Sequence, residues 1–176
     1  MKDASLNHER CLIAPEAISA RIKEIAVELN HDYRDKDLVV LMVLKGAICL
    51  AADLIRQLSV PFQLESVQCS SYGARGDQRG ALEIIGLDRV DIRHRDVLVV
   101  DDIFDSGHTL SVLVQTLETK EPRSIKSLVL LKKNVVRTVT MEPDYVLFEI
   151  DNLFVIGYGL DYKEGYRGLA GVHVLK

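Results

Sequence analysis

The sequence has few cysteines, and none of its apolar runs is long. Cys11, Cys49 and Cys69 are odd in number and widely spaced, without a C-x-x-C pair, which argues against a disulfide framework and against a structural zinc site. We expect them to be core thiols of a protein from a reducing compartment. The longest apolar run, residues 38–44, is far shorter than the roughly 20 residues that cross a bilayer, which excludes a membrane-spanning helix.

Basic residues are also scarce relative to acidic ones. The chain has 22 Lys and Arg residues against 26 Asp and Glu residues, a formal net charge of −4, and no basic block, which disfavours nucleic acid as the main partner. Residues 1–10 are charged and no apolar stretch of signal-peptide length follows them, so we expect a cytoplasmic protein without a membrane partner. At 176 residues, the chain is predicted to form a single domain, residues 1–176.

Helical and strand periods alternate along the chain and predict an α/β fold. After Pro15, apolar residues recur at spacings of three and four up to Leu29, which indicates an amphipathic helix. Residues 38–44 are continuously apolar and rich in β-branched side chains, as is typical of a parallel strand covered on both faces. Further strands are expected at 62–70, 81–86, 96–100 and 127–131, and further helices at 47–58 and 109–117. The prediction is a mostly parallel central sheet flanked by helices.

Two regions depart from this alternation. Residues 71–80 contain three glycines and two arginines without an apolar anchor, and predict a mobile loop. Residues 145–150 and 154–156 flank Asp151-Asn152-Leu153, which favours a β-hairpin. From residue 157 onward the chain is rich in glycine, tyrosine and charge, and predicts a small irregular C-terminal part.

Three aspartates gather where one predicted strand ends. Asp101 and Asp102 follow strand 96–100 and so lie at its carboxyl end, where ligands bind in open α/β sheets. The segment from Asp105 to Thr109 comes just before a predicted helix, so its backbone N–H groups and the helix dipole can hold a phosphate. A helix cap alone would explain Asp105 or Ser106 taken singly. Three carboxylates in five residues are costly without a cation or sugar hydroxyls between them, which favours a functional site.

This segment resembles the phosphoribosyl-pyrophosphate signature of type I phosphoribosyltransferases, and residues 38–174 resemble the hypoxanthine-guanine branch of that family. Four motifs occur in the family's order: Leu44-Lys45-Gly46, Ser71-Tyr72, the aspartate segment, and Lys133 followed by residues 154–162 and Arg167. The resemblance implies the type I fold, in which the C-terminal part is a hood and residues 133–176 recognise the base. It also implies a purine salvage enzyme that transfers 5-phosphoribose from phosphoribosyl pyrophosphate to hypoxanthine or guanine, with Mg²⁺ as cofactor.

By this resemblance, most site residues bind phosphoribosyl pyrophosphate. Asp101 and Asp102 would hold the ribose hydroxyls directly or through the metal, and Asp161 would be a further metal ligand. Asp105 would be the general acid/base that exchanges a proton with the imidazole-ring nitrogen of the purine. The 5-phosphate and pyrophosphate contacts would come from Lys45, Gly46, Ser106, Gly107, Thr109 and Arg167. In the family, the peptide bond before the residue matching Lys45 is often cis.

The resemblance assigns the remaining residues to the base and to a lid. The ammonium group of Lys133 has donors only, so it suits the carbonyl of a 6-oxopurine and rejects the amino group of adenine, although Lys132 remains an alternative. Phe154 would stack on the base, and Val155 would use its backbone near the purine 2-position. Ser71 and Tyr72 would close over the site and exclude water.

Other functions fit parts of the pattern. A phosphoacceptor receiver domain also has paired acids at a strand end, but at its first strand, whereas 100 residues precede Asp101. A non-catalytic regulator of the same fold would sense phosphoribosyl pyrophosphate without reaction, and the retention of Asp105, Lys133 and Phe154 argues against it. The family likeness further suggests a homodimer or homotetramer.

Overall fold

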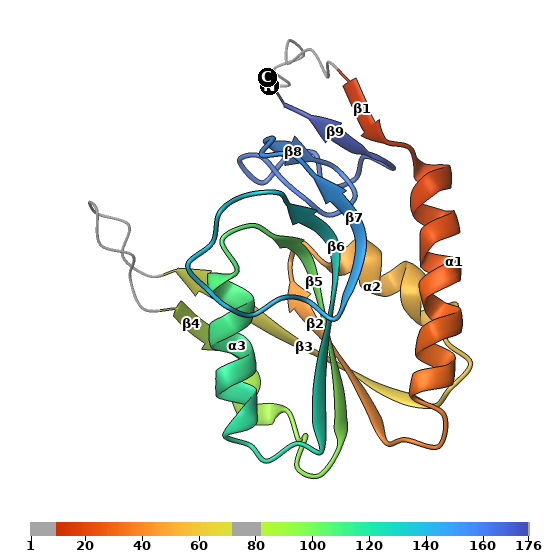
Figure 1. The fold of residues 1–176 in the computed structure, drawn as a ribbon, viewed down its shortest axis with the longest axis vertical. Coiled ribbons are helices and arrows are strands. Elements are labelled where there is room, and N and C mark those ends of the chain that lie inside the picture. The colour runs from red at the N-terminus through yellow and green to blue at the C-terminus, as the bar shows by residue number, and fades with distance from the viewer. Residues whose placement is uncertain (1–9, 72–81, 176) are drawn as a thin grey trace.

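The computed structural model describes residues 10–71 and 82–175, and arranges them as a central sheet with helices on both faces and a smaller sheet at one end (Figure 1). The predicted loop 71–80 falls, apart from the backbone of Ser71, outside the described residues. None of the described helices is long and apolar enough to cross a membrane.

Within the described ranges, the central sheet has six strands in the order β4-β3-β2-β5-β6-β7. Neighbouring strands run parallel except β3 and β4, which confirms the predicted mostly parallel sheet. The strands are β2 Leu38–Leu44, β3 Phe62–Ser71, β4 Leu82–Ile85, β5 Asp96–Phe104, β6 Ser124–Lys133 and β7 Tyr145–Ile150. β5 is longer than predicted because the ladder continues past the apolar run: Asp101 pairs with Val129, and Phe104 with Lys132.

The helices cover both faces of this sheet and create two hydrophobic cores. Helices α1 (Pro15–Asp32) and α2 (Ile48–Ile55) pack on one face, and α3 (His108–Glu118) packs on the other. Successive strand residues point to opposite faces, so Val40 joins the core under α1 and α2 while Val39 joins the core under α3. This explains why β2 is apolar at every position. A short 3₁₀ helix, Leu87–Arg89, leads from β4 towards β5.

A second sheet joins the two ends of the described chain. It has the order β1-β9-β8, with β1 Arg10–Ile13, β9 Val172–Val174 and β8 Val155–Ile156, all antiparallel. It lies at the upper end of the molecule in Figure 1, beyond the carboxyl ends of β5 and β6. The C-terminal part is therefore more regular than predicted, and it includes a strand from the N-terminal side of the chain.

The predicted hairpin of residues 145–150 and 154–156 is wrong. β7 pairs in parallel with β6, whereas β8 pairs with β9 in the second sheet. The segment Asp151-Asn152-Leu153 does turn sharply, since the N–H of Leu153 donates to the carbonyl of Asp151 at 2.7 Å, but the turn connects two sheets. Each strand finds its partner far away in the sequence, which local turn signals do not encode.

The cysteines are all free thiols. Cys49 and Cys69 are half-buried, but Cys11 is exposed, so the expectation of a core thiol is wrong for Cys11. The reason is its place in β1, an edge strand of the smaller sheet.

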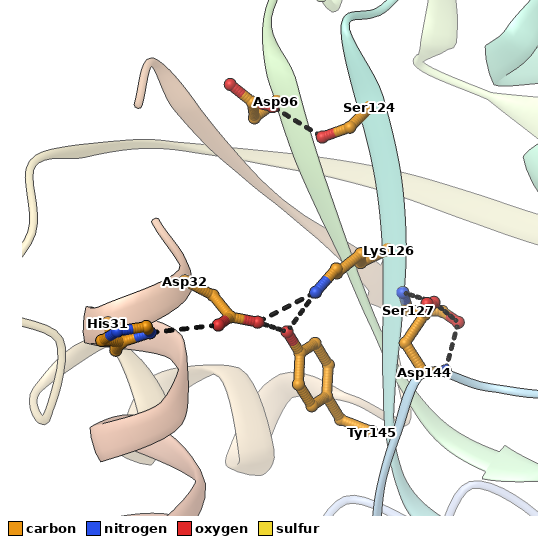
Figure 2. A network of polar contacts seen from close by, with 8 residues as sticks. All are labelled: His31, Asp32, Asp96, Ser124, Lys126, Ser127, Asp144 and Tyr145. Carbon is orange, nitrogen blue, oxygen red and sulfur yellow. Dashed lines mark hydrogen bonds and ion pairs between the residues drawn. The ribbon is translucent and has the colours of Figure 1, made fainter. Parts of the chain in front are cut away.

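Polar contacts tie the end of α1 to the first residues of β6 and β7 (Figure 2). The Nζ of Lys126 donates to Asp32 Oδ2 and to the hydroxyl of Tyr145, both at 2.9 Å, and that hydroxyl donates to the same Asp32 oxygen. The hydrogen bond from Tyr145 and then that from Lys126 lower the pKa of Asp32. The hydrogen bonds with Tyr145 and Asp32 raise the pKa of Lys126. The end of α1 is thereby fixed to β6 and β7.

Candidate active site

A cavity of about 330 Å³ lies where β2 and β5 end. Its walls are the turns after these two strands, the start of α3 and part of the C-terminal segment. Predicted site residues from all of these segments line it, namely Lys45, Gly46, Asp101, Asp102, Asp105, Ser106, Gly107, Thr109, Asp161 and Arg167. The fold therefore brings together residues that are far apart in the sequence.

The acidic pair forms one wall of the cavity. Asp101 is only 6% exposed, and its Oδ1 accepts the N–H of Asp102 at 2.9 Å. Asp102 Oδ1 in turn accepts the N–H of Ile103 at 2.8 Å. Burial and then the charge of Asp102 raise the pKa of Asp101 well above its ordinary value, and burial raises the pKa of Asp102. Two adjacent carboxyl groups withdrawn from water are suited to a ligand that brings positive charge or hydroxyl donors.

The oxygen ligands in the cavity suit a magnesium ion that is bound together with its substrate. In the described part of the chain, no group of three or more His, Cys, Asp or Glu residues converges to hold a metal. Asp161 pairs instead with Arg167 Nη2 at 2.7 Å and accepts the N–H of Glu164 at 2.9 Å. Mg²⁺ typically takes one or two protein carboxylates and completes its shell with water and substrate phosphates. Asp101 and Asp102 fit that requirement.

The turn between β5 and α3 leaves no room for a side chain at Gly107. Its φ of +77° lies in the left-handed region, and an added Cβ would come within 2.5 Å of Val139 Cγ2 and 2.7 Å of the Phe104 ring. α3 begins directly afterwards at His108, one residue earlier than predicted. The first N–H groups of a helix lack helical partners and carry partial positive charge, so this end of α3 suits an anion such as a phosphate.

The turn after β2 is packed closely on both sides. The peptide bond between Leu44 and Lys45 is cis, in agreement with the resemblance. A Cβ on Gly46 would lie 1.7 Å from Asp102 Oδ2, and a Cβ on Gly159 would lie 2.0 Å from the carbonyl oxygen of Gly46. Gly46 is thus held between the acidic pair and the C-terminal segment.

A carboxylate that sequence reasoning missed contacts both cations of the cavity. Glu164 Oε2 lies 3.1 Å from Lys45 Nζ and 3.5 Å from Arg167 Nη2, and the hydrogen bond from Lys45 lowers the pKa of Glu164. Arg167 also donates to the carbonyl of Gly159 at 2.8 Å. The two residues expected to meet pyrophosphate are therefore already paired with a carboxylate of the chain. The sequence offered a signal, because Glu164 lies between residues 154–162 and Arg167 of the last motif, three residues before Arg167.

The structure separates the two candidate lysines at the end of β6. Lys133 is 9% exposed, and its Nζ donates to Asp105 Oδ2 at 2.7 Å. Lys132 contacts Glu142 at 2.9 Å and Glu149 at 3.5 Å. Neighbouring strand residues point to opposite faces, which explains why the two ammonium groups diverge. Lys133 thus contacts the predicted proton carrier, and Lys132 does not.

Phe154 and Val155, the other described residues predicted to bind the base, do not line the cavity, and neither does Lys133. Phe154 is 54% exposed, and its ring meets that of Tyr162 edge to face with centroids 5.8 Å apart. Val155 is buried in β8. Ser71 ends β3, and Tyr72 is outside the described residues. Conversely, Cys69 lines the cavity although it was not predicted to, and burial raises the pKa of its thiol to about 11.

The chain is similar to known proteins over nearly its whole length. Residues 13–163 match the family model described as the phosphoribosyl transferase domain. The hypoxanthine-guanine phosphoribosyltransferase of Mycobacterium avium is 44% identical over 171 residues, covering 93% of this chain and 84% of the relative. That of Bacillus subtilis is 39% identical over 168 residues, covering 96% and 93%. A hypoxanthine phosphoribosyltransferase variant from Trypanosoma cruzi, solved as a ternary substrates complex, has a TM-score of 0.88 and 39% identity, covering 96% of this chain and 95% of that one.

Proposed function

The chain belongs to the phosphoribosyl transferase family, and on this premise we propose that it is a hypoxanthine-guanine phosphoribosyltransferase of purine salvage. The enzyme transfers 5-phosphoribose from phosphoribosyl pyrophosphate to hypoxanthine or guanine, and gives IMP or GMP and pyrophosphate. The contact between Asp105 and Lys133 carries the proposal, because it joins a proton carrier to a carbonyl-binding cation beside the cavity.

The cavity offers a separate contact for each part of phosphoribosyl pyrophosphate. The turn that holds Ser106, Gly107 and Thr109 would bind the 5-phosphate at the start of α3. Asp101 and Asp102 would accept hydrogen bonds from the ribose hydroxyls, directly or through the metal. The pyrophosphate would lie against the turn of Lys45 and Gly46 and against the guanidinium of Arg167.

Magnesium, when bound with the substrate, would supply positive charge that offsets the pyrophosphate and the acidic pair. We propose Asp101 and Asp102 as the carboxylates that hold it. Asp161 would join them only after its ion pair with Arg167 opens.

The protein's own groups would act on the charge and the proton that the reaction moves. As the bond from ribose to pyrophosphate breaks, positive charge develops on the sugar, and the carboxylates of Asp101 and Asp102 would stabilise it. Asp105 would hold or release the proton of the purine imidazole ring. Lys133 would donate to the neighbouring 6-carbonyl, so the pair matches two adjacent groups on one edge of a 6-oxopurine. Adenine presents an amino group there, and an amino group donates hydrogen bonds. The Lys133 ammonium has no acceptor for them.

Other residues would complete the site. Phe154 would stack on the purine, Val155 would contact its 2-position through the backbone, and Ser71 and Tyr72 would exclude water. We further propose a cytoplasmic homodimer or homotetramer. For the Trypanosoma cruzi relative, a role of the C-terminal region in the oligomeric state has been analysed structurally.

The test is to incubate the purified protein with phosphoribosyl pyrophosphate, Mg²⁺ and one of hypoxanthine, guanine, xanthine or adenine, and to measure nucleotide by chromatography. We expect IMP and GMP and no AMP. Failure to form a monophosphate from any 6-oxopurine would overturn the proposal. Binding of phosphoribosyl pyrophosphate without product, measured by calorimetry, would identify a non-catalytic regulator instead.

A further inference from the structure

Arg137 connects the ends of two central strands through its guanidinium group. It lies in the segment between β6 and β7, four residues after Lys133. Its Nε donates to the carbonyl of Asp105 at 2.7 Å, and its Nη2 donates to the carbonyls of Phe104 and Lys133. One rigid, planar group therefore holds the backbone of the predicted proton carrier and that of the predicted base-reading lysine.

The same guanidinium packs on the ring of Phe104, which lies beside the turn at Gly107. Its central carbon lies 4.7 Å from the centroid of the Phe104 ring, and a Cβ on Gly107 would collide with this ring as well as with Val139. Val139, two residues after Arg137, lies on the same side of Gly107. The segment after β6 thus braces the turn that leads into α3.

The burial and the partners of Arg137 favour arginine over any other cation. Its side chain is only 9% exposed, and its charged partner, Glu142, is 3.9 Å away, beyond hydrogen-bond distance. Three backbone carbonyls therefore provide most of the compensation for a buried charge. A lysine has a single nitrogen on a flexible stem, and cannot bond to carbonyls of two strands in one plane as a guanidinium does.

We propose that Arg137 is a positioning residue that sets the spacing between the Asp105 carboxylate and the Lys133 ammonium. The proposal rests on the function proposed above for this pair. Arg137 bonds to both backbones, so neither residue can move relative to the other without loss of a hydrogen bond. Reacting groups misplaced by about 1 Å can lose on the order of 10²-fold in rate. Arg137 would thus act through Asp105 and Lys133 without contact to either substrate.

A double-mutant cycle with Arg137→Lys and Lys133→Met tests this. We expect Arg137→Lys alone to lower kcat/KM for hypoxanthine by about 10–100-fold. In the Lys133→Met background, the same change should lower it by less than about 3-fold, because the spacing no longer matters once the ammonium is absent. Additive effects would overturn the proposal, since a residue needed only for stability lowers activity equally in both backgrounds.

Controls separate this outcome from a loss of folding and from failure of the proposed function. Arg93→Lys is the matched control: Arg93 pairs on the surface with Glu121 near the amino end of β5, and activity should stay within about 2-fold. If Arg137→Lys does not fold, Arg137→Gln replaces it with the same criteria, and unfolding of both would overturn the proposal by making the residue purely structural. An inactive wild-type protein would refute the proposed function itself, whereas an active wild type with an unaffected Arg137→Lys variant refutes the positioning role alone.

Discussion

Replacement of Gly46 by alanine should weaken the binding of phosphoribosyl pyrophosphate while leaving the fold largely intact. The new methyl group would lie 1.7 Å from Asp102 Oδ2 and 2.4 Å from its Cγ, far inside van der Waals contact. Gly46 is not among the glycines with positive φ, so alanine adds no left-handed strain. The carboxylate of Asp102 is the part that can move, and it is the part that we expect to hold the ribose.

The expected loss in free energy of unfolding is smaller than the expected loss in free energy of substrate binding. Rotation of Asp102 away from its preferred conformation costs about 0.5–1.5 kcal/mol. At about 2–4 °C per kcal/mol for a chain of this length, Tm should fall by only a few degrees. A hydrogen bond to a charged group contributes about 1.5–3 kcal/mol. Its loss corresponds to a rise of roughly 10–140-fold in the KM for phosphoribosyl pyrophosphate, at 1.4 kcal/mol per tenfold.

The assay is steady-state kinetics with varied phosphoribosyl pyrophosphate at saturating hypoxanthine, together with thermal unfolding. Gly168→Ala is the matched control, because a Cβ at Gly168 meets no atom within 4 Å, and its KM should stay within about twofold. An unchanged KM in Gly46→Ala with normal Tm would show that Asp102 does not bind the ribose. A fall in Tm far above a few degrees would show that the backbone, and not the carboxylate, absorbs the collision.

Further predictions concern Asp105, Glu164 and the polar contacts in Figure 2. Asp105→Asn should lower kcat by about 10²–10⁴-fold with little change in the KM for phosphoribosyl pyrophosphate, and an unaffected kcat would remove Asp105 from its acid/base role. Glu164→Gln should lower that KM by up to about fivefold in low-salt kinetics, because Lys45 would lose its carboxylate partner and Arg167 would lose one, while its ion pair with Asp161 stays. A raised KM would show that Glu164 does not compete with pyrophosphate for these cations. Tyr145→Phe should lower the free energy of unfolding in urea by about 1 kcal/mol at pH 7. Since the pKa of Asp32 in the folded state lies below its ordinary value of 3.8, the ionised contact stabilises the fold above about pH 4 and is lost as pH falls, so the difference between Tyr145→Phe and wild type should shrink from pH 5 to pH 2. A difference that is constant over this range would show that the Asp32 contact is not its source.

The sequence was sufficient to predict those helices and strands in which apolar residues recur at a regular spacing or form an unbroken run. Every position of β2 is apolar because helices cover both faces, and the apolar spacing after Pro15 locates α1. The position of the acidic pair and of the turn before α3 beside a cavity was also predictable, because three carboxylates in five residues are unusual without a ligand.

The features that the sequence did not reveal depend on distant partners. β1 is four residues long and pairs with β9 more than 150 residues later, so no local pattern identifies it. β8 was assigned to β7 because a turn signal separates them, whereas its partner is β9. Arg137 lies in a loop without periodicity, and its partners are backbone carbonyls, which any sequence would supply. The contact of Lys133 with Asp105, and of Lys132 with Glu142 instead, depends on the direction of each side chain.

The small sheet has a consequence for the order in which the protein is built on the ribosome. β2, β5 and β6 can pair once residue 133 has emerged, together with the turn that begins α3. β8 must wait for β9, which is synthesised almost last and also pairs with β1 near the start of the chain. Contacts between such distant segments form late, because chain closure must precede them. A nascent chain would therefore form the side of the cavity around Asp101, Asp102 and Asp105 first, and the side that carries Asp161 and Arg167 last.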